Sequence, residues 1–517
     1  MIAKIIMLVV FFGIMIAIGI YCRKNATDVN GFVLGGRSVG PWLTAFAYGT
    51  SYFSAVVFIG YAGQFGWKYG IASTWIGIGN AVIGSFLAWF VLGRRTRVMT
   101  QHLDSATMPE FFGKRFNSPA LKICASIIVF IFLIPYTASL YNGLSRLFAM
   151  AFDVDFKVCI VVMAILTGIY VIAGGYMATA INDFIQGCVM IVGIIAVITA
   201  VLNTNGGFGA AMDGLARIND PLVSDTPGVF ASFLGPDIPN LFGVIVLTSL
   251  GTWGLPQMVQ KFYAIKNESQ IQKGTIISTV FALIVAGGSY FLGGFGRLFT
   301  DRLDVIDGAP AGGYDSIIPQ MLSTLPDLLI GLVVILVLSA SMSTLSSLVI
   351  ASSSTLTIDV IKGNLIKEMD EKKQVFIIRL LIVVFIVISV LIAIFQYENN
   401  VTFIAQLMGV SWGALAGAFL APFLYGLYWK RTTKISVWVC FIFGAGIMVV
   451  NLFARSIFPA FLQSPINCGA FAMVGGLILV PLVSLFTPKP DTAEVERMFS
   501  CYEKKKEVKS KNSLGDG

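Results

Sequence analysis

Thirteen long apolar stretches divide this chain, and they constrain its fold more than any other feature of the sequence. A helix needs about 20 apolar residues to cross a bilayer core of about 30 Å, where no water can satisfy exposed backbone groups. The sequence therefore predicts an all-α, polytopic membrane protein with about thirteen transmembrane helices. The predicted spans, numbered first to thirteenth, are 2–22, 41–63, 69–93, 119–151, 156–175, 182–203, 236–258, 272–297, 326–361, 374–396, 401–428, 434–456 and 466–487.

Composition and motifs exclude several classes of function. Only 12% of the residues are charged, against roughly 25% in a typical soluble domain. We therefore expect the lipid bilayer as the surroundings of the chain and no nucleic-acid partner. The sequence contains no H-E-x-x-H or Walker A motif, and it predicts no enzyme and no ATP-driven pump. An ion gradient is the remaining common energy source.

The basic residues predict how the chain is oriented in a cell membrane, because cytoplasmic loops carry an excess of Lys and Arg. If the amino terminus lies outside, the segments predicted to be cytoplasmic hold 27 of the 35 basic residues, and 35 − 27 = 8 remain elsewhere. Thirteen spans then place the carboxyl terminus in the cytoplasm.

The ninth span combines an apolar helix with many hydroxyl groups. Ala340, Ser343, Thr344 and Ser347 are three or four residues apart, so they share one helical face. Such a stripe can supply oxygen ligands to a cation. Small hydroxyl residues also bond to their own backbone and let helices pack closely, and spacing alone slightly favours that second interpretation.

The second and seventh spans contain helix-weakening sequences. The second contains Gly-Thr-Ser-Tyr-Phe-Ser over 49–54, and the seventh contains Gly-Thr-Trp-Gly-Leu-Pro-Gln over 251–257. A broken helix inside a transporter frees carbonyl groups that can bind an ion and helix ends that can face a solute. Both spans are therefore candidates for a binding site.

These two spans occupy matching places if spans two to six and seven to eleven form two units of five. Five is odd, so the second unit enters the membrane from the opposite side and the two units are inverted. We accordingly divide the chain into a first helix and cytoplasmic loop (1–40), an inverted-repeat core (41–430), two peripheral helices (431–487) and a cytoplasmic tail (488–517).

Asp183 stands at the beginning of the predicted sixth span. An acid near lipid is costly and often functional, but a carboxylate at the first turn of a helix can also cap free N–H groups. The sequence by itself leaves these two interpretations about equal.

Several motifs occur in the order found in one known family. They are Gly-Gly-Arg-Ser-Val-Gly-Pro-Trp over 35–42, Met-Pro-Glu-Phe-Phe over 108–112, Gly174-Gly175 with Asp183 and Gln186, Gly-Leu-Pro-Gln over 254–257, Ser-Met-Ser-Thr-Leu-Ser over 341–346, and Ala-Pro-Phe over 421–423 with Trp-Lys-Arg over 429–431. The chain resembles the sodium:solute symporter family, which includes the bacterial sodium/proline symporter, over nearly its whole length. This resemblance implies a LeuT-like 5+5 inverted-repeat fold and transport driven by inward sodium flow.

The resemblance also implies two cation sites. For the first Na⁺, the matching positions are the carbonyl groups of Thr50, Phe53 and Ala340 and the hydroxyl groups of Ser343 and Thr344, which are hard oxygen ligands. For a second Na⁺, the matching positions are Asp183, Ser346 and Ser347.

The chain departs from the family pattern at Tyr52, where the proline transporter has an acid, so proline as the solute is in question. We expect the solute cavity to be lined from the second, fourth, seventh and eleventh spans by Tyr52, Ser54, Tyr136, Trp253, Gln257 and Gln406.

The sequence thus predicts a sodium-coupled symporter that imports a small organic solute, either an amino acid such as proline or a carboxylate, by alternating access. Two alternatives are a proton-coupled symporter in which Asp183 titrates and a membrane sensor that binds solute without moving it. The sequence does not specify the solute, the number of ions per cycle or the oligomeric state.

Overall fold

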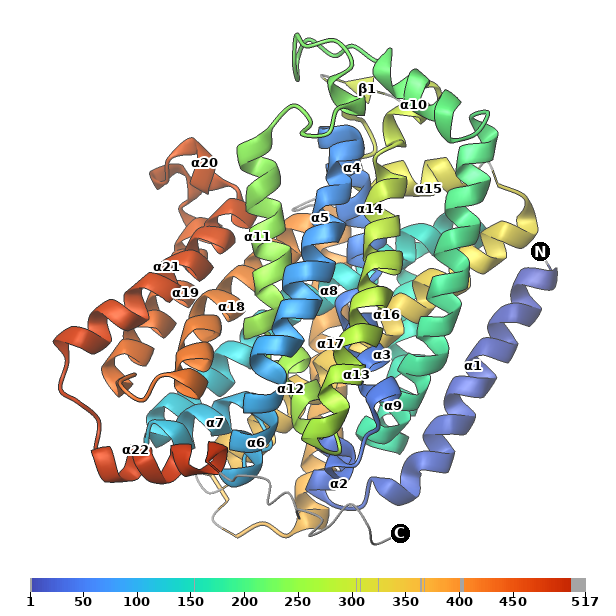
Figure 1. Cartoon of the computed structure of the whole chain (residues 1–517). Coiled ribbons are helices and arrows are strands. Elements are labelled where there is room, and N and C mark those ends of the chain that lie inside the picture. Colours follow the sequence, from blue (N-terminus) through green and yellow to red (C-terminus); the bar gives the residue numbers. More distant parts are fainter. Residues whose placement is uncertain are drawn as a thin grey trace, which may run out of the picture.

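The chain forms a bundle of helices that cross one another at varied angles (Figure 1). The computed structural model describes residues 2–152, 154–303, 305–306, 308–323, 325–362, 365–366, 368–399 and 404–503. Its only strands in these ranges are β1 (Val305–Ile306) and β2 (Ala309–Pro310), which form a short antiparallel hairpin outside the bundle. The all-α prediction is confirmed.

The helices follow the predicted spans closely. The longer ones are α1 (Ile2–Cys22), α3 (Pro41–Tyr52), α8 (Pro119–Phe152), α9 (Phe156–Thr204), α11 (Ile238–Gly254), α13 (Ile271–Ala282), α16 (Asp327–Thr355), α17 (Glu371–Asn399), α18 (Ile404–Tyr428), α19 (Lys434–Phe453) and α21 (Pro465–Phe486). The shorter ones used below are α2 (Val29–Leu34), η3 (Val56–Tyr61), α4 (Ala62–Tyr69), α5 (Thr74–Gly79), η5 (Asn80–Leu87), α6 (Arg94–His102), α7 (Met108–Arg115), α10 (Phe208–Ala216), α12 (Pro256–Ala264), α14 (Gly288–Gly293), α20 (Ala460–Gln463) and α22 (Thr492–Phe499).

The number of crossings depends on two glycines. Among the described residues, ten helical segments are long and apolar enough to cross a membrane, or eleven with the bent pair α11 and α12. Two of them, Val56–His102 and Lys157–Thr204, contain 47 and 48 residues, more than twice the length of about 20 that one crossing needs. Gly70 (φ +60°) and Gly175 (φ +58°) interrupt them with a conformation that disfavours a side chain. Dividing each there gives 11 + 2 = 13 crossings, as predicted.

The two predicted helix breaks are similar in geometry. α3 ends at Tyr52, where Phe53 is extended (φ −86°, ψ 126°), and the chain resumes its helix in η3. α11 ends at Gly254, where Leu255 is extended (φ −82°, ψ 122°), and α12 begins with Pro256 after a bend of 46°. Proline is favoured at the first position of a helix because it has no N–H group to leave unpaired. The sequence signals for both breaks are therefore correct.

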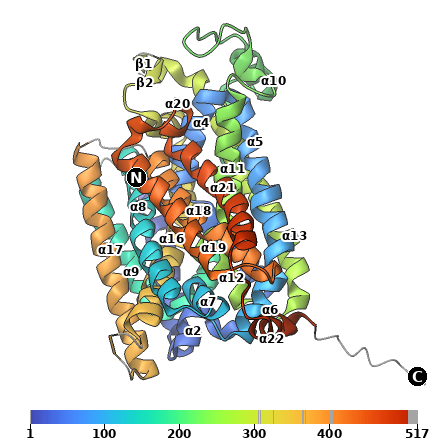
Figure 2. The same ribbon diagram turned by 90° about the vertical axis from the view of Figure 1, so that its left-hand side faces the viewer.

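α16 lies at the centre of the bundle and packs against α3, α8 and α9 (Figure 2). Every residue of this helix from Val333 to Thr355 is buried, including all of its hydroxyl side chains. Its position explains its composition, since a helix surrounded by other helices is not restricted to an apolar surface.

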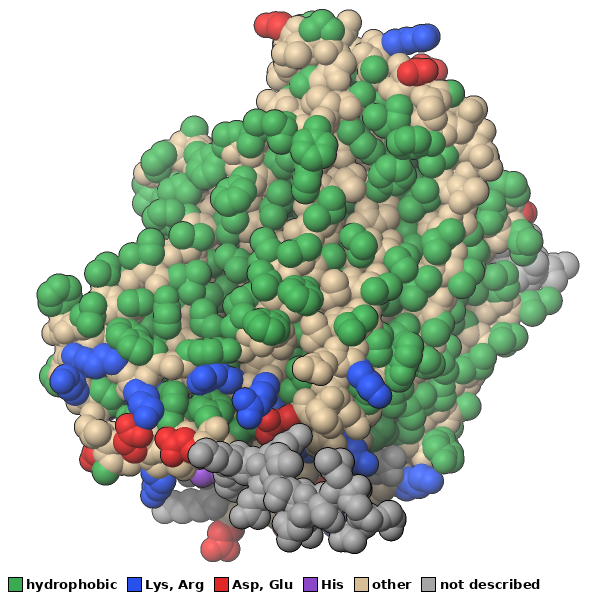
Figure 3. Space-filling model, in the orientation of Figure 1, with side chains coloured by type: hydrophobic (Ala, Val, Ile, Leu, Met, Phe, Trp, Pro, Cys, Tyr) green, Lys and Arg blue, Asp and Glu red, His purple; other side chains and the backbone are tan. Residues whose placement is uncertain are grey.

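The outside of the bundle is apolar over its middle, and Lys and Arg side chains gather in a band near one end (Figure 3). This is the end of α6, α7 and α22, whereas α10, α20 and the β1–β2 hairpin lie at the opposite end (Figures 1 and 2). α22 belongs to the predicted tail but buries Val495, Met498 and Phe499. Residues 504–517 of that tail lie outside the described residues.

Candidate functional site

The break in the first core helix directs backbone oxygens toward α16. The last carbonyl groups of a helix have no donor within that helix. Those of Thr50, Ser51 and Phe53 face the hydroxyl of Thr344, whose Oγ1 lies 3.3, 3.4 and 3.3 Å from the three carbonyl oxygens. Ser343 Oγ lies 3.0 Å from the carbonyl oxygen of Thr50. α3 and α16 thus meet through oxygen atoms, in a region closed to solvent.

This cluster, which we call the carbonyl–hydroxyl cluster, also includes the carbonyl oxygen of Ala340. It lies 3.0 Å from both Ser343 Oγ and Thr344 Oγ1. The structure therefore brings together all five residues predicted for the first Na⁺. Ser51 is an additional member that we did not predict, although its place in the broken segment is a signal that could have identified it.

The cluster has more acceptors than donors. Its two hydroxyl groups carry one hydrogen each, whereas four carbonyl oxygens, of Thr50, Ser51, Phe53 and Ala340, surround them. A small cation that takes only oxygen ligands matches such a surplus of acceptors. Within the described part of the chain, no three His, Cys, Asp or Glu side chains are grouped as a metal site. The chemistry of this cluster thus fits Na⁺ better than it fits a transition metal.

The residues predicted for the second Na⁺ are arranged differently, because a lysine lies among them. Lys261, on α12, places its Nζ 2.9 Å from Ser347 Oγ and 3.9 Å from Asp183 Oδ2. The side chains of Lys261 and Asp183 are only 2% and 1% exposed. Ser346 does not join them, since its hydroxyl donates to the carbonyl oxygen of Ser343 at 2.8 Å. The hydroxyl groups of Ser343, Thr344 and Ser347 also bond to carbonyl oxygens of their own helix.

Asp183 is not a helix cap. It lies eight residues beyond the break at Gly175, about two turns inside the second part of α9. Both carboxylate oxygens lack a hydrogen-bond donor among the described residues. Lys261 is the part of the site that sequence analysis missed, since we counted it with the basic loop residues. Its apolar neighbours Val259, Phe262 and Tyr263 were a signal that it lies in a buried helix.

Two of the residues predicted to contact the solute, Tyr52 and Tyr136, lie beside one indole ring, and a third, Ser54, faces Tyr136. The rings of Tyr52 and Tyr136 each lie 5.9 Å from that of Trp412 on α18. Four polar atoms here are buried without a hydrogen-bond partner among the described residues: Tyr52 Oη, Ser54 Oγ, Tyr136 Oη and Trp412 Nε1. Buried polar groups of this kind normally have a partner, so their gathering marks a place for a polar ligand or water.

Trp412 was not predicted, although it is a polar-tipped aromatic residue in an otherwise small and apolar stretch of the eleventh span. Gly251 of α11 lets this ring approach, because a Cβ at that position would lie 2.5 Å from the indole. We call Tyr52, Ser54, Tyr136 and Trp412 the aromatic pocket, a name that stands for these four side chains alone.

The other three residues predicted to contact the solute are Trp253, Gln406 and Gln257, and the structure places each in different surroundings. Trp253 donates its indole N–H to the carbonyl oxygen of Ile83 at 2.9 Å, which ties it to η5. Gln406 lines a separate cavity of about 580 Å³ near the α10 end. Gln257 is buried at the start of α12, and neither atom of its amide has a partner among the described residues.

Two broken helices in matching positions, with oxygen atoms gathered at one break, define a secondary transporter. Solved structures have the same fold. A substrate-bound, outward-open, Na⁺-coupled sialic acid symporter aligns with a TM-score of 0.74 at 19% identity, over 94% of this chain and 98% of that one. Mhp1, a nucleobase-cation-symport-1 family transporter in a closed conformation, aligns with a TM-score of 0.51 at 14% identity, over 90% and 97%.

Residues 32–444 match the sodium:solute symporter family, and the chain belongs to that family. The osmoregulated proline transporter OpuE of Bacillus subtilis (strain 168) is 29% identical over 97% of this chain and 98% of its own length. A sodium/proline symporter of Staphylococcus aureus (strain JH9) is 31% identical over 86% and 85%. The protein is therefore a multi-pass membrane transporter, not an enzyme, that couples the import of a small solute to Na⁺.

Proposed function

We propose that the solute is a small zwitterionic amino acid such as proline, which binds in the aromatic pocket. Tyr52, Tyr136 and Trp412 offer aromatic faces that attract an ammonium group, and the hydroxyl of Ser54 faces Tyr136. None of these four side chains carries a charge, so the pocket suits a ligand with no net charge. The names of the relatives OpuE and sodium/proline symporter support the same class of solute. A monocarboxylate is the second candidate.

The coupling Na⁺ binds, in this proposal, in the carbonyl–hydroxyl cluster. Five residues contribute: Thr50, Phe53 and Ala340 through carbonyl oxygens, and Ser343 and Thr344 through hydroxyl oxygens. The ion joins the broken helix α3 to α16, while Tyr52 and Ser54 of the same break face the solute. Na⁺ and solute each shift the transporter toward a shared occluded state, because each binds that state more tightly than the open ones.

We further propose that the α22 end is cytoplasmic, with the amino terminus outside and the carboxyl terminus inside. The band of Lys and Arg at the α22 end supports this orientation (Figure 3). Lys261 is buried, which reduces the predicted cytoplasmic basic residues from 27 to 26 and leaves the imbalance intact. We propose that the chain is divided into four parts: the first helix and cytoplasmic loop (1–40), the inverted-repeat core (41–430), two peripheral helices (431–487) and the cytoplasmic tail (488–517).

Uptake by reconstituted vesicles tests this function. Radiolabelled proline should accumulate when an inward Na⁺ gradient is imposed and should not accumulate under a proton gradient alone. Uptake driven by protons without Na⁺ would contradict sodium coupling, and binding of proline without accumulation would favour a sensor. Competition by unlabelled amino acids and monocarboxylates identifies the class of solute. Competition only by monocarboxylates would contradict the amino-acid assignment.

A further inference from the structure

The position predicted for a second Na⁺ already contains a positive charge. Lys261 Nζ lies between Ser347 Oγ, at 2.9 Å, and Asp183 Oδ2, at 3.9 Å. It also lies 5.1 Å from the centre of the Tyr176 ring, whose π face attracts a cation. All four side chains are buried. The ammonium group is thus surrounded on several sides by groups that favour a cation.

A Na⁺ ion at the same place would lack ligands. The Ser347 hydroxyl already receives the lysine, and the carboxylate of Asp183 faces Lys261. The ion would also lie beside an ammonium group in a region of low dielectric constant, where like charges repel strongly. We propose that Lys261 permanently fills this position as a tethered cation, so that one Na⁺, not two, accompanies each solute molecule.

The tethered cation also connects the two broken helices. Ser347 Oγ lies 2.8 Å from Ser51 Oγ, and the carbonyl oxygen of Ser51 belongs to the carbonyl–hydroxyl cluster. A chain of polar contacts therefore runs from Lys261 on α12 through α16 to the break that follows α3. Lys261 is a positioning residue here, because it acts on the cluster through Ser347 and Ser51 without touching it.

The ratio of ²²Na⁺ to solute fluxes in vesicles tests this inference, which rests on the proposed function. We expect a ratio near 1 for the unmodified protein and for Lys261→Arg, which keeps the charge. Lys261→Met removes the charge and leaves Asp183 without its partner, so a second Na⁺ should enter and raise the ratio toward 2. Lys266→Met is the matched control, since Lys266 is exposed on the segment that follows α12, and its ratio should stay near 1.

Should Lys261→Met fail to fold, Lys261→Gln replaces it, because it also removes the charge while keeping a polar group beside Asp183 and Ser347, and its ratio should likewise rise toward 2. The double variant Asp183→Asn/Lys261→Met, which removes both charges, should stay near 1. A ratio of 2 for the unmodified protein would overturn the tethered-cation proposal while leaving sodium coupling intact. An unchanged ratio in Lys261→Met would overturn it as well. Absence of any Na⁺-dependent flux would instead contradict the proposed function.

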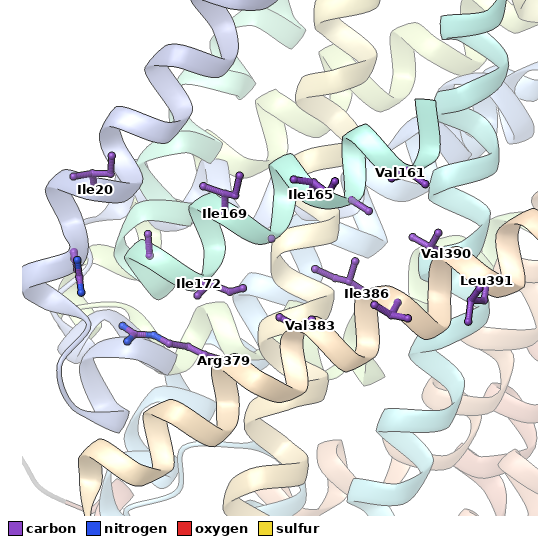
Figure 4. Close-up of a pocket in the computed structure, with 15 residues that line it drawn as sticks. Ile20, Val161, Ile165, Ile169, Ile172, Arg379, Val383, Ile386, Val390 and Leu391 are labelled. Atoms are coloured by element: carbon purple, nitrogen blue, oxygen red, sulfur yellow. The ribbon is translucent and has the colours of Figure 1, made fainter. Parts of the chain in front are cut away.

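A separate observation concerns a groove on the outside of the bundle. α1, the first part of α9 and α17 enclose an apolar groove of about 680 Å³, whose walls include Ile20, Ile165, Ile169 and Ile386 (Figure 4). Two arginines, Arg23 and Arg379, line the same groove. Neither forms an ion pair with an acid among the described residues, and Arg379 leaves its Nε without a partner there. One end of an apolar groove thus carries two unbalanced positive charges.

The geometry points to an anionic phospholipid as the occupant. Its acyl chain matches the isoleucine walls, and its phosphate matches the two guanidinium groups, which bind phosphate through paired N–H donors. Arg379 lies in the amino-terminal part of α17, close to the segment that follows α1. There its Nη2 donates to the carbonyl oxygen of Ala26 at 3.3 Å. A neighbouring protein helix without acidic side chains would fill the apolar part but would leave both arginines without counter-charge.

Native mass spectrometry of the full chain, released from nanodiscs of phosphatidylcholine and phosphatidylglycerol, tests this site. Phosphatidylglycerol should remain bound, and Arg23→Gln/Arg379→Gln should lower its retention at least fivefold. Gly168→Leu, which fills the groove floor, should lower it with both arginines present. Lys273→Gln, an exposed basic residue on α13, is the control and should change nothing. Equal retention in the arginine double variant, or a second protein copy in place of lipid, would overturn the proposal.

Discussion

Two positions on α16, one helical turn apart, differ in electrostatic character: neutral oxygens surround one, and charged side chains meet at the other. Around Ser343 and Thr344, neutral carbonyl and hydroxyl oxygens gather without any charged side chain. Around Ser347, the ammonium of Lys261 and the carboxylate of Asp183 face each other. Two unit charges about 4 Å apart interact by about 4 kcal/mol at an effective dielectric constant of about 20, so the second position is dominated by charge and the first is not.

This difference indicates how a transporter can separate an exchangeable ion from a fixed one. Neutral oxygens hold a Na⁺ that must leave in every cycle, because no full negative charge retains it. A lysine attached to the backbone balances Asp183 and cannot be released. The proposed coupling ion and the proposed tethered cation therefore require different ligands, and the following substitutions probe that contrast.

The largest effect is expected for Asp183→Asn. It leaves the ammonium of Lys261 buried without its carboxylate, and breaking a buried ion pair in this way typically costs about 3–5 kcal/mol. The thermal unfolding temperature of the purified protein in detergent should fall strongly. Asp183→Asn/Lys261→Met should recover most of that loss. If the single variant is as stable as the unmodified protein, the charge-dominated description of this position is wrong.

Ser343→Ala/Thr344→Ala is expected to have the next largest effect. It removes two oxygens from the carbonyl–hydroxyl cluster, at about 1–1.5 kcal/mol each, so the apparent affinity for Na⁺ should fall about 30- to 150-fold. The Na⁺ dependence of uptake measures this change. Stabilisation by Na⁺ in thermal unfolding should weaken in parallel, because a ligand stabilises the state that it binds. An unchanged Na⁺ dependence would show that the ion binds elsewhere.

Tyr136→Phe should have a smaller effect, and it should change the affinity for the solute and not the affinity for Na⁺. It removes one unpartnered hydroxyl from the aromatic pocket, and loss of one hydrogen bond to a solute costs about 1 kcal/mol. The KM for the solute should rise about fivefold, while the Na⁺ concentration for half-maximal uptake, measured at saturating solute, should stay the same. A change confined to the Na⁺ dependence would mean that Tyr136 belongs to the ion site.

Ser346→Ala should have the smallest effect. Its hydroxyl bonds to the carbonyl oxygen of Ser343 on its own helix and contributes to neither cation position in our proposals. Stability should change by about 1 kcal/mol or less, the cost of one hydrogen bond, and both the Na⁺ dependence and the flux ratio should be unaffected. This variant is the matched control for Ser343→Ala/Thr344→Ala. If Ser346→Ala lowered the sodium affinity as much as Ser343→Ala/Thr344→Ala does, the proposed difference between Ser346 and the two sodium ligands would be wrong.

Most of the fold could be predicted from the sequence, because its signals are local. Lipid requires each span to satisfy its own backbone, so length and apolarity located all thirteen crossings. Glycine and proline located the breaks that follow Tyr52 and Gly254. The residues of the proposed first sodium site could also be predicted from the sequence. Residue spacing gave the hydroxyl stripe of α16, and the family resemblance paired that stripe with the first helix break.

What the sequence by itself determined, then, is the set of helices, their breaks and the polar face of α16, because each depends on residues a few positions apart. Only the tertiary structure decided that Lys261 lies between Asp183 and Ser347, that Trp412 stands between Tyr52 and Tyr136, and that Gln406 belongs to another cavity. These residues are separated by tens to hundreds of positions along the chain. Their meeting depends on how whole helices pack, which no local pattern of residues specifies.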